Sequence, residues 1–181
     1  VKPANMGSSV GVHKVSDQDA FDQAVRDAFD YDTKILIEEF IDGRELECAV
    51  LGNLQPQASA VGEIKPSHDF YSYEAKYIDE HGAGLEIPAN ISRADSDKIR
   101  DLAVKTFQTL ECEGLGRVDC FLKSDGEIVV NEINTMPGFT KISMYPQLWE
   151  ASGISYTDLI TKLIELGLER FEREQKLKTS F

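Results

Sequence analysis

The stretch EIVVNEINTMPGFT, residues 127–140, begins like a β-strand but carries an acid and an amide, Glu132 and Asn134, where apolar residues are expected. The strand-like run LGRVDCFLK before it carries Arg117 and Asp119 at the same spacing of two. Carboxylate and amide oxygens are hard ligands that suit Mg²⁺, which usually binds together with substrate phosphates. An arginine in the same row can hold a phosphoryl oxygen or a developing oxyanion. These residue types therefore indicate phosphoryl chemistry at a metal site.

The dipeptide Asp125-Gly126 separates the two runs and predicts a two-residue type I′ turn, in which Ser124 faces Glu127. Each step back along one strand then meets a step forward along the other. The Pro-Gly pair at residues 137–138 ends the second strand close to its polar residues, at a place where a site can open.

This register places Asp119 opposite Glu132 and Arg117 opposite Asn134, with all four side chains on one face of the sheet. Two carboxylates directly across a ladder repel each other unless a cation lies between them. We therefore predict that Asp119, Glu132 and Asn134 bind a divalent metal. The alternative is a solvated face of an edge hairpin with an ordinary Arg–Asp–Glu salt-bridge cluster.

Two further stretches have the composition of a nucleotide site. In VKPANMGSSVGVHKV, a short strand with Lys2 precedes a glycine-rich flap around Ser8 and Ser9, whose N–H groups can cradle phosphate oxygens. The P-loop pattern is missing, so a structural hairpin turn is the alternative. In ILIEEFIDGRELE, the pair Glu38-Glu39 ends a strand where a backbone edge and an acid can hold adenine and ribose. A strand with outward polar residues, which would include Glu45 and Glu47, is the alternative there.

Composition limits the partners of the chain. With 181 residues and 41% hydrophobic content, it can bury one good core or two small ones. The net charge of −13 argues against nucleic acid and anionic membranes, and no apolar run approaches the roughly 20 residues of a membrane span. Three cysteines without metal-ligand spacing favour a reduced cytosolic setting. The opening VKPANMG has no initiator Met, which favours a fragment cut within an element.

Periodicity predicts an α+β fold. Helices are expected at residues 16–29 behind a Ser16 cap, at residues 95–110, and from Ser155 onward. Five strands, several linked by tight turns, are expected at residues 33–40, 44–52, 57–64, 115–123 and 127–134. The polar, Tyr-rich stretch at residues 65–84 is longer than most connections, which is typical of a functional loop.

Taken together, these stretches resemble the ATP-grasp ligases, and within them the D-alanine–D-alanine ligases. The matching runs are VKPANMGSSVGV, EEFIDGRELECAVLG, FYSYEAKY, GLGRVDCFL and NEINTMPGFT followed by ISMYP, spread over nearly the whole chain. The likeness covers only the C-terminal part of the family's chain. It implies an ATP-grasp fold with a mixed, mostly antiparallel sheet flanked by helices. Residues 1–37 would be the remainder of the central subdomain with its phosphate flap, and residues 38–181 the C-terminal subdomain.

The resemblance implies that ATP phosphorylates the carboxylate of one D-alanine, and that the amine of a second D-alanine attacks the resulting acyl phosphate. The product, D-alanyl-D-alanine, would serve peptidoglycan synthesis in the bacterial cytoplasm. The cofactors would be ATP and two Mg²⁺ ions, with Mn²⁺ as a substitute, and the full-length protein would be a homodimer. The fragment alone is expected to be inactive, because it lacks the surface that holds the first substrate.

The resemblance also assigns roles to matching positions. Phosphate contacts fall to Lys2, Lys76, Ser8 and Ser9, metal binding to Asp119, Glu132 and Asn134, the adenine connection to Glu38, Glu39, Phe40 and Ile41, and the ribose to Glu45. Arg117 would stabilise the acyl phosphate, and Gly138 and Ser143 would hold the second D-alanine. Tyr77 would tie the Tyr-rich lid to Ser8.

One departure from the family and two alternatives accompany this interpretation. The family often has Lys at the position of Glu39, so here the backbone is expected to read the adenine. A D-alanine–D-lactate ligase shares the fold, ATP and metals, and the EAKY run that ends in Tyr77 favours the peptide-forming members. A non-catalytic nucleotide-binding module is the other alternative, which Arg117 and Lys76 argue against.

Overall fold

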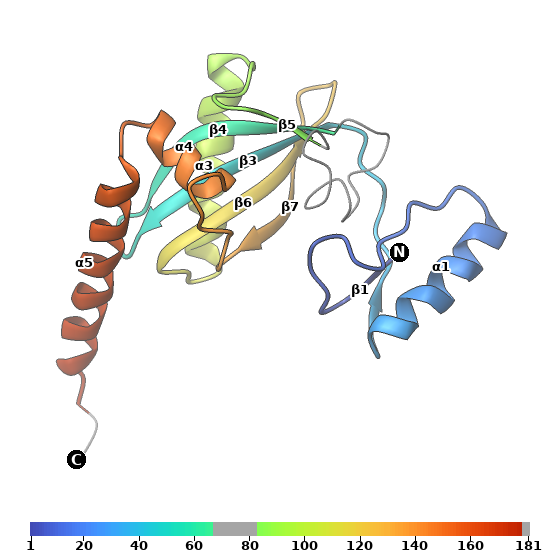
Figure 1. The fold of residues 1–181 in the computed structure, drawn as a ribbon, viewed down its shortest axis with the longest axis horizontal. Helices are drawn as coiled ribbons and strands as arrows, with labels where there is room; N and C mark the ends of the chain where they lie inside the picture. The colour runs from blue at the N-terminus through green and yellow to red at the C-terminus, as the bar shows by residue number, and fades with distance from the viewer. Residues whose placement is uncertain (67–82, 179–181) are drawn as a thin grey trace. The chain divides into compact units, whose positions relative to one another are not determined.

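The structure, a computed structural model, describes residues 1–66 and 83–178 (Figure 1). The chain forms two compact units, one containing Val1–Asp42 and the other containing Gly43–Ile64 and the residues from Leu85 onward. The assignment of residues 1–37 and 38–181 to two ATP-grasp subdomains stays a prediction.

Within residues 1–42, the first unit is built on one helix and two very short strands. Strand β1 (Lys2–Pro3) pairs antiparallel with β2 (Ile35–Leu36), and helix α1 (Gln18–Tyr31) lies between them in the sequence. The helix begins at Asp17, whose carboxylate accepts a hydrogen bond from the Ala20 N–H. The predicted Ser16 cap is therefore wrong by one residue, because the carboxylate of Asp17 takes that role.

The strand predicted at residues 33–40 is much shorter than expected. Strand β2 ends at Leu36, and the next four residues, 37–40, are exposed and outside any strand. Because β1 offers only two residues for pairing, the ladder has no partner beyond Leu36. Residues 12–16, which follow the glycine flap, also form no strand.

The second unit contains a sheet of the order β5-β4-β3-β6-β7 with three helices around it (Figure 1). The strands are β3 (Arg44–Gly52), β4 (Gln57–Pro66), β5 (Ala83–Glu86), β6 (Gly114–Leu122) and β7 (Ile128–Asn134), and the helices are α3 (Arg93–Thr109), α4 (Met144–Ala151) and α5 (Tyr156–Gln175). The pairs β3–β4, β3–β6 and β6–β7 are antiparallel, which confirms the α+β class. Within the described ranges, no helix has the length and apolar composition of a membrane span.

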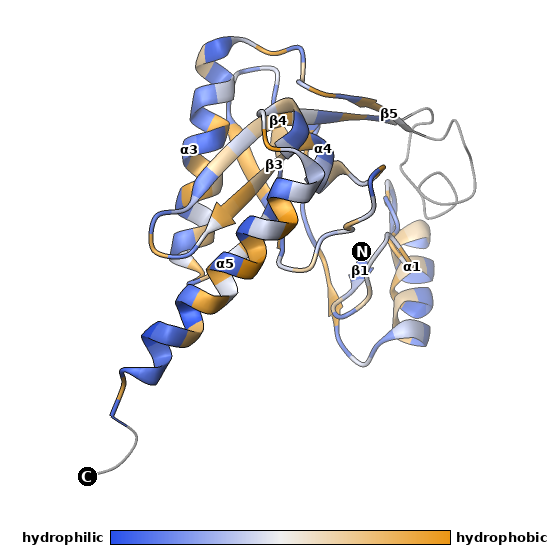
Figure 2. Ribbon diagram, turned by 60° about the vertical axis from the view of Figure 1, so that its left-hand side comes forward, coloured by the Kyte–Doolittle hydropathy of each residue, from blue (hydrophilic) through white to orange (hydrophobic). Residues whose placement is uncertain are grey.

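Helix α3 covers one face of this sheet. Its buried residues Ile99, Ala103 and Phe107 join every second residue of β3 and β6 in the main core, which includes Leu46, Cys48, Val50, Val118 and Cys120. In Figure 2 the outside of α3 is largely hydrophilic, whereas the strands behind it carry apolar stretches. Because strand side chains alternate, the intervening residues of β3 and β6 face away from α3.

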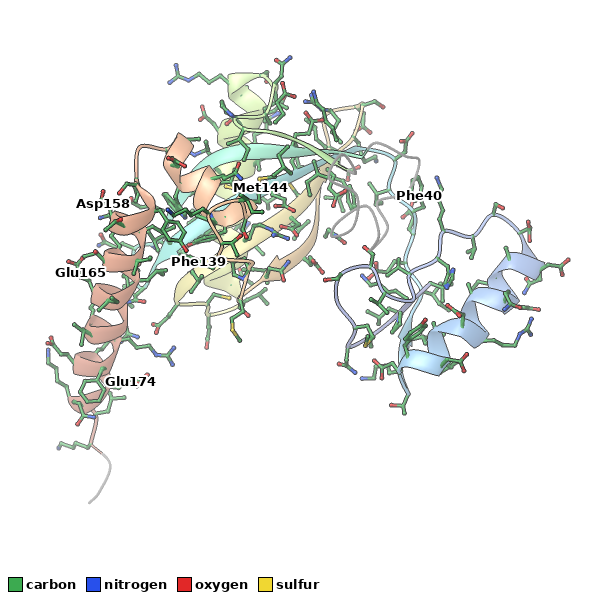
Figure 3. All side chains as sticks on the ribbon, in the orientation of Figure 1. Phe40, Phe139, Met144, Asp158, Glu165 and Glu174 are labelled. Atoms are coloured by element: carbon green, nitrogen blue, oxygen red, sulfur yellow. The ribbon has the colours of Figure 1, made fainter. Side chains whose placement is uncertain are left out.

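The opposite face is partly covered by α4, a helix that the periodicity did not predict. Met144, Tyr145, Leu148 and Trp149 are all buried, so the short helix has no polar stripe to reveal its period. The helix lies close to the sheet, and the glycine at position 62 permits this approach, since a Cβ there would lie 3.0 Å from the Met144 sulfur. The Tyr145 hydroxyl donates a hydrogen bond of 2.9 Å to the Val50 carbonyl and fastens the helix to β3. Figure 3 labels Met144 on α4 and Phe139 in the loop before this helix.

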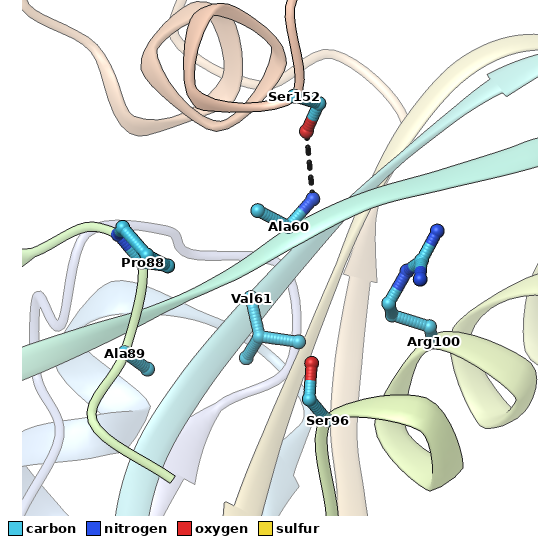
Figure 4. Close-up of a pocket in the computed structure, with 7 residues that line it drawn as sticks. All are labelled: Ala60, Val61, Pro88, Ala89, Ser96, Arg100 and Ser152. Atoms are coloured by element: carbon cyan, nitrogen blue, oxygen red, sulfur yellow. Dashed lines mark hydrogen bonds between the residues drawn. The ribbon is translucent and has the colours of Figure 1, made fainter. Parts of the chain in front are cut away.

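A hollow beside β4 is lined by Ala60, Val61, Pro88, Ala89, Ser96, Arg100 and Ser152 (Figure 4). Two side chains there bond the backbone of β4. The Ala60 N–H donates to the Ser152 hydroxyl at 2.7 Å, and Arg100 donates to the Ala58 carbonyl at 3.1 Å. None of the predicted site residues that the structure describes lines this hollow.

Candidate active site

The site is built on the β6–β7 hairpin, whose turn differs from the prediction. The Lys123 N–H donates to the Glu127 carbonyl at 2.9 Å, and the Gly126 N–H donates to the Lys123 carbonyl at 3.0 Å. Gly126 has a φ of +85°, whereas Asp125 is not among the residues with positive φ. The loop therefore has three residues and ends in a left-handed glycine, so the predicted two-residue type I′ turn is wrong.

The register at the candidate residues is nevertheless confirmed. Asp119 pairs with Glu132 and Arg117 pairs with Asn134. A bulge next to Asp119 explains why, since Cys120 pairs with Val130 and leaves Asn131 as an extra residue on β7. The extra loop residue and the bulge residue lie on the same hairpin and offset each other, so the residues predicted to face each other do so.

Arg117 is the centre of the charged row on this face. Its Nε and Nη2 atoms donate to the two carboxylate oxygens of Asp119, each at 2.7 Å. Its Nε atom also lies 3.0 Å from the Oε2 atom of Glu47, which projects from β3 directly opposite Asp119. Only 5% of the Asp119 surface and 3% of the Glu47 surface are exposed, so this is no solvated surface cluster.

The β7 side of the row is more open. Glu132 is exposed and Asn134 is half-buried, and the Asn134 amide donates to the Glu132 carboxylate at 3.2 Å. Burial disfavours the charged form of Arg117, but its hydrogen bonds to Asp119 and the charges of Glu47, Asp119 and Glu132 outweigh burial and raise its pKa above the ordinary value. The guanidinium is therefore permanently charged and held by carboxylates from its own strand and from its neighbours.

Glu47 is the residue that the sequence interpretation missed. The pattern of β3 was compatible with a strand whose polar residues face outward, yet Glu47 is buried and belongs to the row. The sequence contains one indication of this role, because Glu47 follows Glu45 at a spacing of two on the strand that pairs with β6. Glu45 itself lies near the start of β3, half-buried and opposite Phe121.

The row fits a divalent cation by its charge and donor chemistry. Three carboxylates, those of Glu47, Asp119 and Glu132, accompany one guanidinium, which leaves an excess of negative charge. The oxygen donors of Asp119, Glu132 and Asn134 are of the type that Mg²⁺ prefers. Among the residues that the structure describes, no three His, Cys, Asp or Glu side chains form a ligand cluster, and the predicted set instead combines two carboxylates with an amide.

Gly138 and Ser143 lie together in the loop between β7 and α4. A Cβ at Gly138 would come within 3.1 Å of the Ser143 hydroxyl oxygen. That hydroxyl accepts a hydrogen bond from the Thr140 N–H at 3.0 Å and bonds the Thr140 hydroxyl at 2.8 Å. Phe139 packs against Tyr145 and Tyr156, which fixes this loop to α4 and α5 (Figure 3).

The glycine flap of the first unit is a tight turn with an unusual backbone. The Val10 N–H donates to the Gly7 carbonyl at 3.1 Å across Ser8 and Ser9, whose φ angles are +54° and +61°. Two consecutive non-glycine residues in the left-handed region are strained, and such strain is frequent at ligand sites. The base of the flap is closed by two hydrogen bonds between Val1 and His13.

Two cations at the base of the flap contact the predicted adenine connection. The Lys2 ammonium lies 2.8 Å from the Glu38 carboxylate, and the Lys14 ammonium lies 3.7 Å from the centroid of the Phe40 ring. Phe40, labelled in Figure 3, is 59% exposed, and Glu39 is also exposed while Ile41 is half-buried. The predicted flap and the predicted adenine connection are therefore neighbours within one unit.

The structure thus gathers the predicted residues into two groups, one in each unit. Lys2, Ser8, Ser9 and the residues 38–41 belong to the first, while Glu45, the charged row, Gly138 and Ser143 belong to the second. Lys76 and Tyr77 lie outside the described residues.

Solved structures identify the fold as ATP-grasp. The structure of the D-alanine–D-alanine ligase from Coxiella burnetii matches 97% of this chain with a TM-score of 0.85 and 39% sequence identity, over 46% of that ligase. The VanG D-Ala:D-Ser ligase from Enterococcus faecalis matches 91% of the chain with a TM-score of 0.83 and 38% identity, over 48% of its own length.

Among proteins with the ATP-grasp fold, the sequence comparisons identify the family of this chain. The family profile described as D-ala D-ala ligase C-terminus matches residues 1–165, and the chain belongs to this family. The D-alanine–D-alanine ligase of Oceanobacillus iheyensis is 63% identical over 99% of the chain, and ligase A of Escherichia coli K12 is 58% identical over the same share. The chain spans about half the length of the curated relatives it matches, 49% and 50% in these two cases.

Proposed function

We propose that the protein containing this chain joins two molecules of D-alanine into D-alanyl-D-alanine and converts ATP to ADP and phosphate. The observation that carries the proposal is the buried row of Arg117 and Asp119 beside Glu132 and Asn134, in a chain 63% identical to a D-alanine–D-alanine ligase. A site that only bound a nucleotide would not need a guanidinium fixed among carboxylates from neighbouring strands.

The reaction would proceed in two steps. The γ-phosphoryl group of ATP moves to a carboxylate oxygen of the first D-alanine, which gives an acyl phosphate and ADP. The amine of the second D-alanine then attacks the acyl carbon, and the tetrahedral intermediate expels phosphate. As in other phosphoryl transfers, positioning and charge neutralisation supply most of the catalysis.

In the second unit, Arg117 is proposed to donate hydrogen bonds to the acyl phosphate and the oxyanion. Asp119, Glu132 and Asn134 are proposed to hold two Mg²⁺ ions, or Mn²⁺ in their place, and bound ions of this kind neutralise phosphate charge. Gly138 and Ser143 are proposed to hold the carboxylate of the second D-alanine.

In the first unit, Lys2 with the Ser8-Ser9 turn is proposed to contact the phosphates of ATP. The connection from Glu38 to Ile41 is proposed to bind adenine, with Glu45 of the second unit on the ribose. Lys76 and Tyr77 keep their predicted roles in phosphate binding and lid closure.

A chimeric ligase tests the function. The 180 matching residues of the chain would replace the corresponding 49% of the O. iheyensis ligase, and the chimera would be assayed with ATP, Mg²⁺ and D-alanine. We expect ADP, phosphate and dipeptide in equal amounts, while the chain by itself forms no dipeptide. A folded chimera that binds ATP but forms no dipeptide would contradict the proposal and favour a nucleotide-binding module.

The second substrate is tested in the same assay. The likeness to a D-Ala:D-Ser ligase means that one fold accompanies different second substrates in solved proteins. D-serine and D-lactate would therefore be offered together with D-alanine, and the dipeptide of D-alanine is expected to predominate. A predominance of the D-lactate ester would favour the alternative of a D-alanine–D-lactate ligase.

We also propose that the whole protein is a homodimer in the bacterial cytoplasm, where ATP and free D-alanine meet. Light scattering of the chimera during size-exclusion chromatography tests the dimer.

A further inference from the structure

Glu47 forms part of a row of three carboxylates across three neighbouring strands. It pairs with Asp119 of β6, and Asp119 in turn pairs with Glu132 of β7. With 3% of its surface exposed, Glu47 is the most buried of the three. Buried carboxylates are costly unless a cation compensates them, so the row needs the guanidinium of Arg117.

The guanidinium is shared unequally between two of these carboxylates. Asp119 receives two hydrogen bonds from Arg117, each at 2.7 Å, whereas Glu47 is reached by the Nε atom at 3.0 Å. Both oxygens of Asp119 are thus engaged by the same side chain. Each oxygen of Asp119 keeps a second lone pair that can bind a cation, but the cation repels the guanidinium and draws the carboxylate toward itself, so the contact with Arg117 weakens.

We infer that Glu47 is a positioning residue, which keeps the guanidinium of Arg117 in place when Asp119 turns from Arg117 to a cation. This inference rests on the proposed function for the cation. Glu47 is suited to the task because it comes from a different strand and stands on the far side of Asp119 from Glu132. Without it, the only carboxylate of the described residues that pairs with Arg117 would be the one that the cation recruits.

The sheet offers a matched control on its other face. Glu63 of β4 is also buried, with 5% of its surface exposed, and it accepts two hydrogen bonds of 2.7 Å from Arg44. A Glu63→Gln change therefore removes one charge from a buried Glu–Arg pair that lies outside the candidate site. Any general effect of such a loss appears in both variants, whereas an effect on Arg117 appears only with Glu47→Gln.

The test follows the exchange of the Arg117 Nε proton with solvent by nuclear magnetic resonance, in the chimeric ligase and with an Arg117→Lys variant for assignment. Spectra are recorded without and with Mg²⁺ and a non-hydrolysable ATP analogue. In the parent and in Glu63→Gln, this proton should stay protected in both conditions. In Glu47→Gln, addition of the Mg²⁺–nucleotide should accelerate its exchange at least tenfold.

Steady-state kinetics give a second measurement. Glu47→Gln should lower kcat by about 10-fold to 100-fold with little change in the KM for ATP, and Glu47→Asp should recover part of the loss. Unchanged protection of the Nε proton in Glu47→Gln would overturn the inference, as would equal exchange with and without Mg²⁺. Because the exchange experiment needs no turnover, it decides the role of Glu47 even if the chimera forms no dipeptide and the proposed function fails.

Discussion

In the second unit, the candidate residues project from strands of seven and nine residues that are backed by helix α3 and its buried side chains. In the first unit, the strands have two residues each, and the candidate residues are held by a strained turn, an ion pair and a cation over a ring. The charged row thus has its geometry fixed by the core, whereas the flap and the adenine connection depend on local, exposed contacts. Under the proposed function, this contrast suits different roles for the two groups of residues: the charged row would orient the reacting groups, and the flap with the adenine connection would adapt to the nucleotide.

The largest effect on this contrast is expected from a substitution in the core behind the charged row. Phe107→Ala removes a fully buried ring that lies 3.1 Å from where a Cβ on Gly116, next to Arg117, would stand, and it should lower the free energy of unfolding by about 3–5 kcal/mol. Urea denaturation measures this loss. Phe171→Ala is the control, because that ring is 58% exposed and its removal should change stability little. If the two substitutions lowered the free energy of unfolding equally, the packing of α3 against the strands of the row would not be the stabilising contact.

The second largest effect is expected from removal of Arg117, the centre of the row, and it should appear in turnover. In the chimeric ligase, Arg117→Ala should lower kcat by about 100-fold to 1,000-fold while the KM for ATP changes little, because an oxyanion donor acts mainly in the transition state. Arg44→Ala removes the arginine of the pair on the other face and should leave turnover largely unchanged in protein that remains folded. Parallel losses of ATP binding and turnover in Arg117→Ala would contradict this role.

The core beneath the row also predicts a pH dependence of stability. Burial raises the pKa of Cys48 to about 12, and burial with the nearby charges of Cys48 and Asp119 raises the pKa of Cys120 to about 12. An unfolded thiol ionises near pH 8.5, so the stabilising contribution is complete below that pH and is lost as the pH rises toward 12.

At pH 9.5, the free energy of unfolding should be lower than at neutral pH by about 1.4 kcal/mol for each of the two thiols. Urea denaturation at pH 7.5 and pH 9.5 measures the difference, and Cys120→Ala should reduce it by the share of one thiol. If Cys120→Ala left the pH dependence unchanged, ionisation of this thiol would not be its cause.

The smallest effect is expected in the first unit. Lys14→Gln removes the cation over the Phe40 ring, a contact worth about 0.5–1 kcal/mol at exposed sites, so the KM for ATP should rise about twofold to fivefold with kcat unchanged. Lys14→Arg should restore binding, and Lys105→Gln on α3 serves as the control for loss of a lysine. A larger loss of kcat than of ATP binding would show that the first unit does more than adapt to the nucleotide.

Much of the row could be predicted because alternation along a strand is a local property. Asp119 with Arg117 and Glu132 with Asn134 reveal their common face by spacing alone, and Asp125-Gly126 marks the turn between them. The number of loop residues and the bulge at Asn131 depend on how the two strands twist together, which the spacing does not contain. The predicted register was correct because these two irregularities compensate.

Glu47 and α4 were missed for different reasons. The burial of Glu47 results from the pairing of β3 with β6, which are about 70 residues apart in the sequence, so no local pattern distinguishes it from an outward polar residue. Helix α4 is eight residues long, and its residues are buried almost all round, so it lacks the amphipathic period that reveals a helix. The other helices, each with a polar face, were predicted with small errors at their ends.

The hydrogen bonds along β4 have a consequence for the behaviour of the chain in solution. Unpaired backbone groups at the edge of a sheet act as a template on which another strand can add, and this is a common start of aggregation. Ser152 and Arg100 occupy an N–H and a carbonyl of β4 that would otherwise be open to such addition. β5, which pairs with β4 on that side, has four residues against ten in β4, so it covers only part of β4. Since Ser152 stands at the end of α4, a cleavage that released α4 and α5 would uncover the Ala60 N–H, and the remaining piece should self-associate through this part of β4.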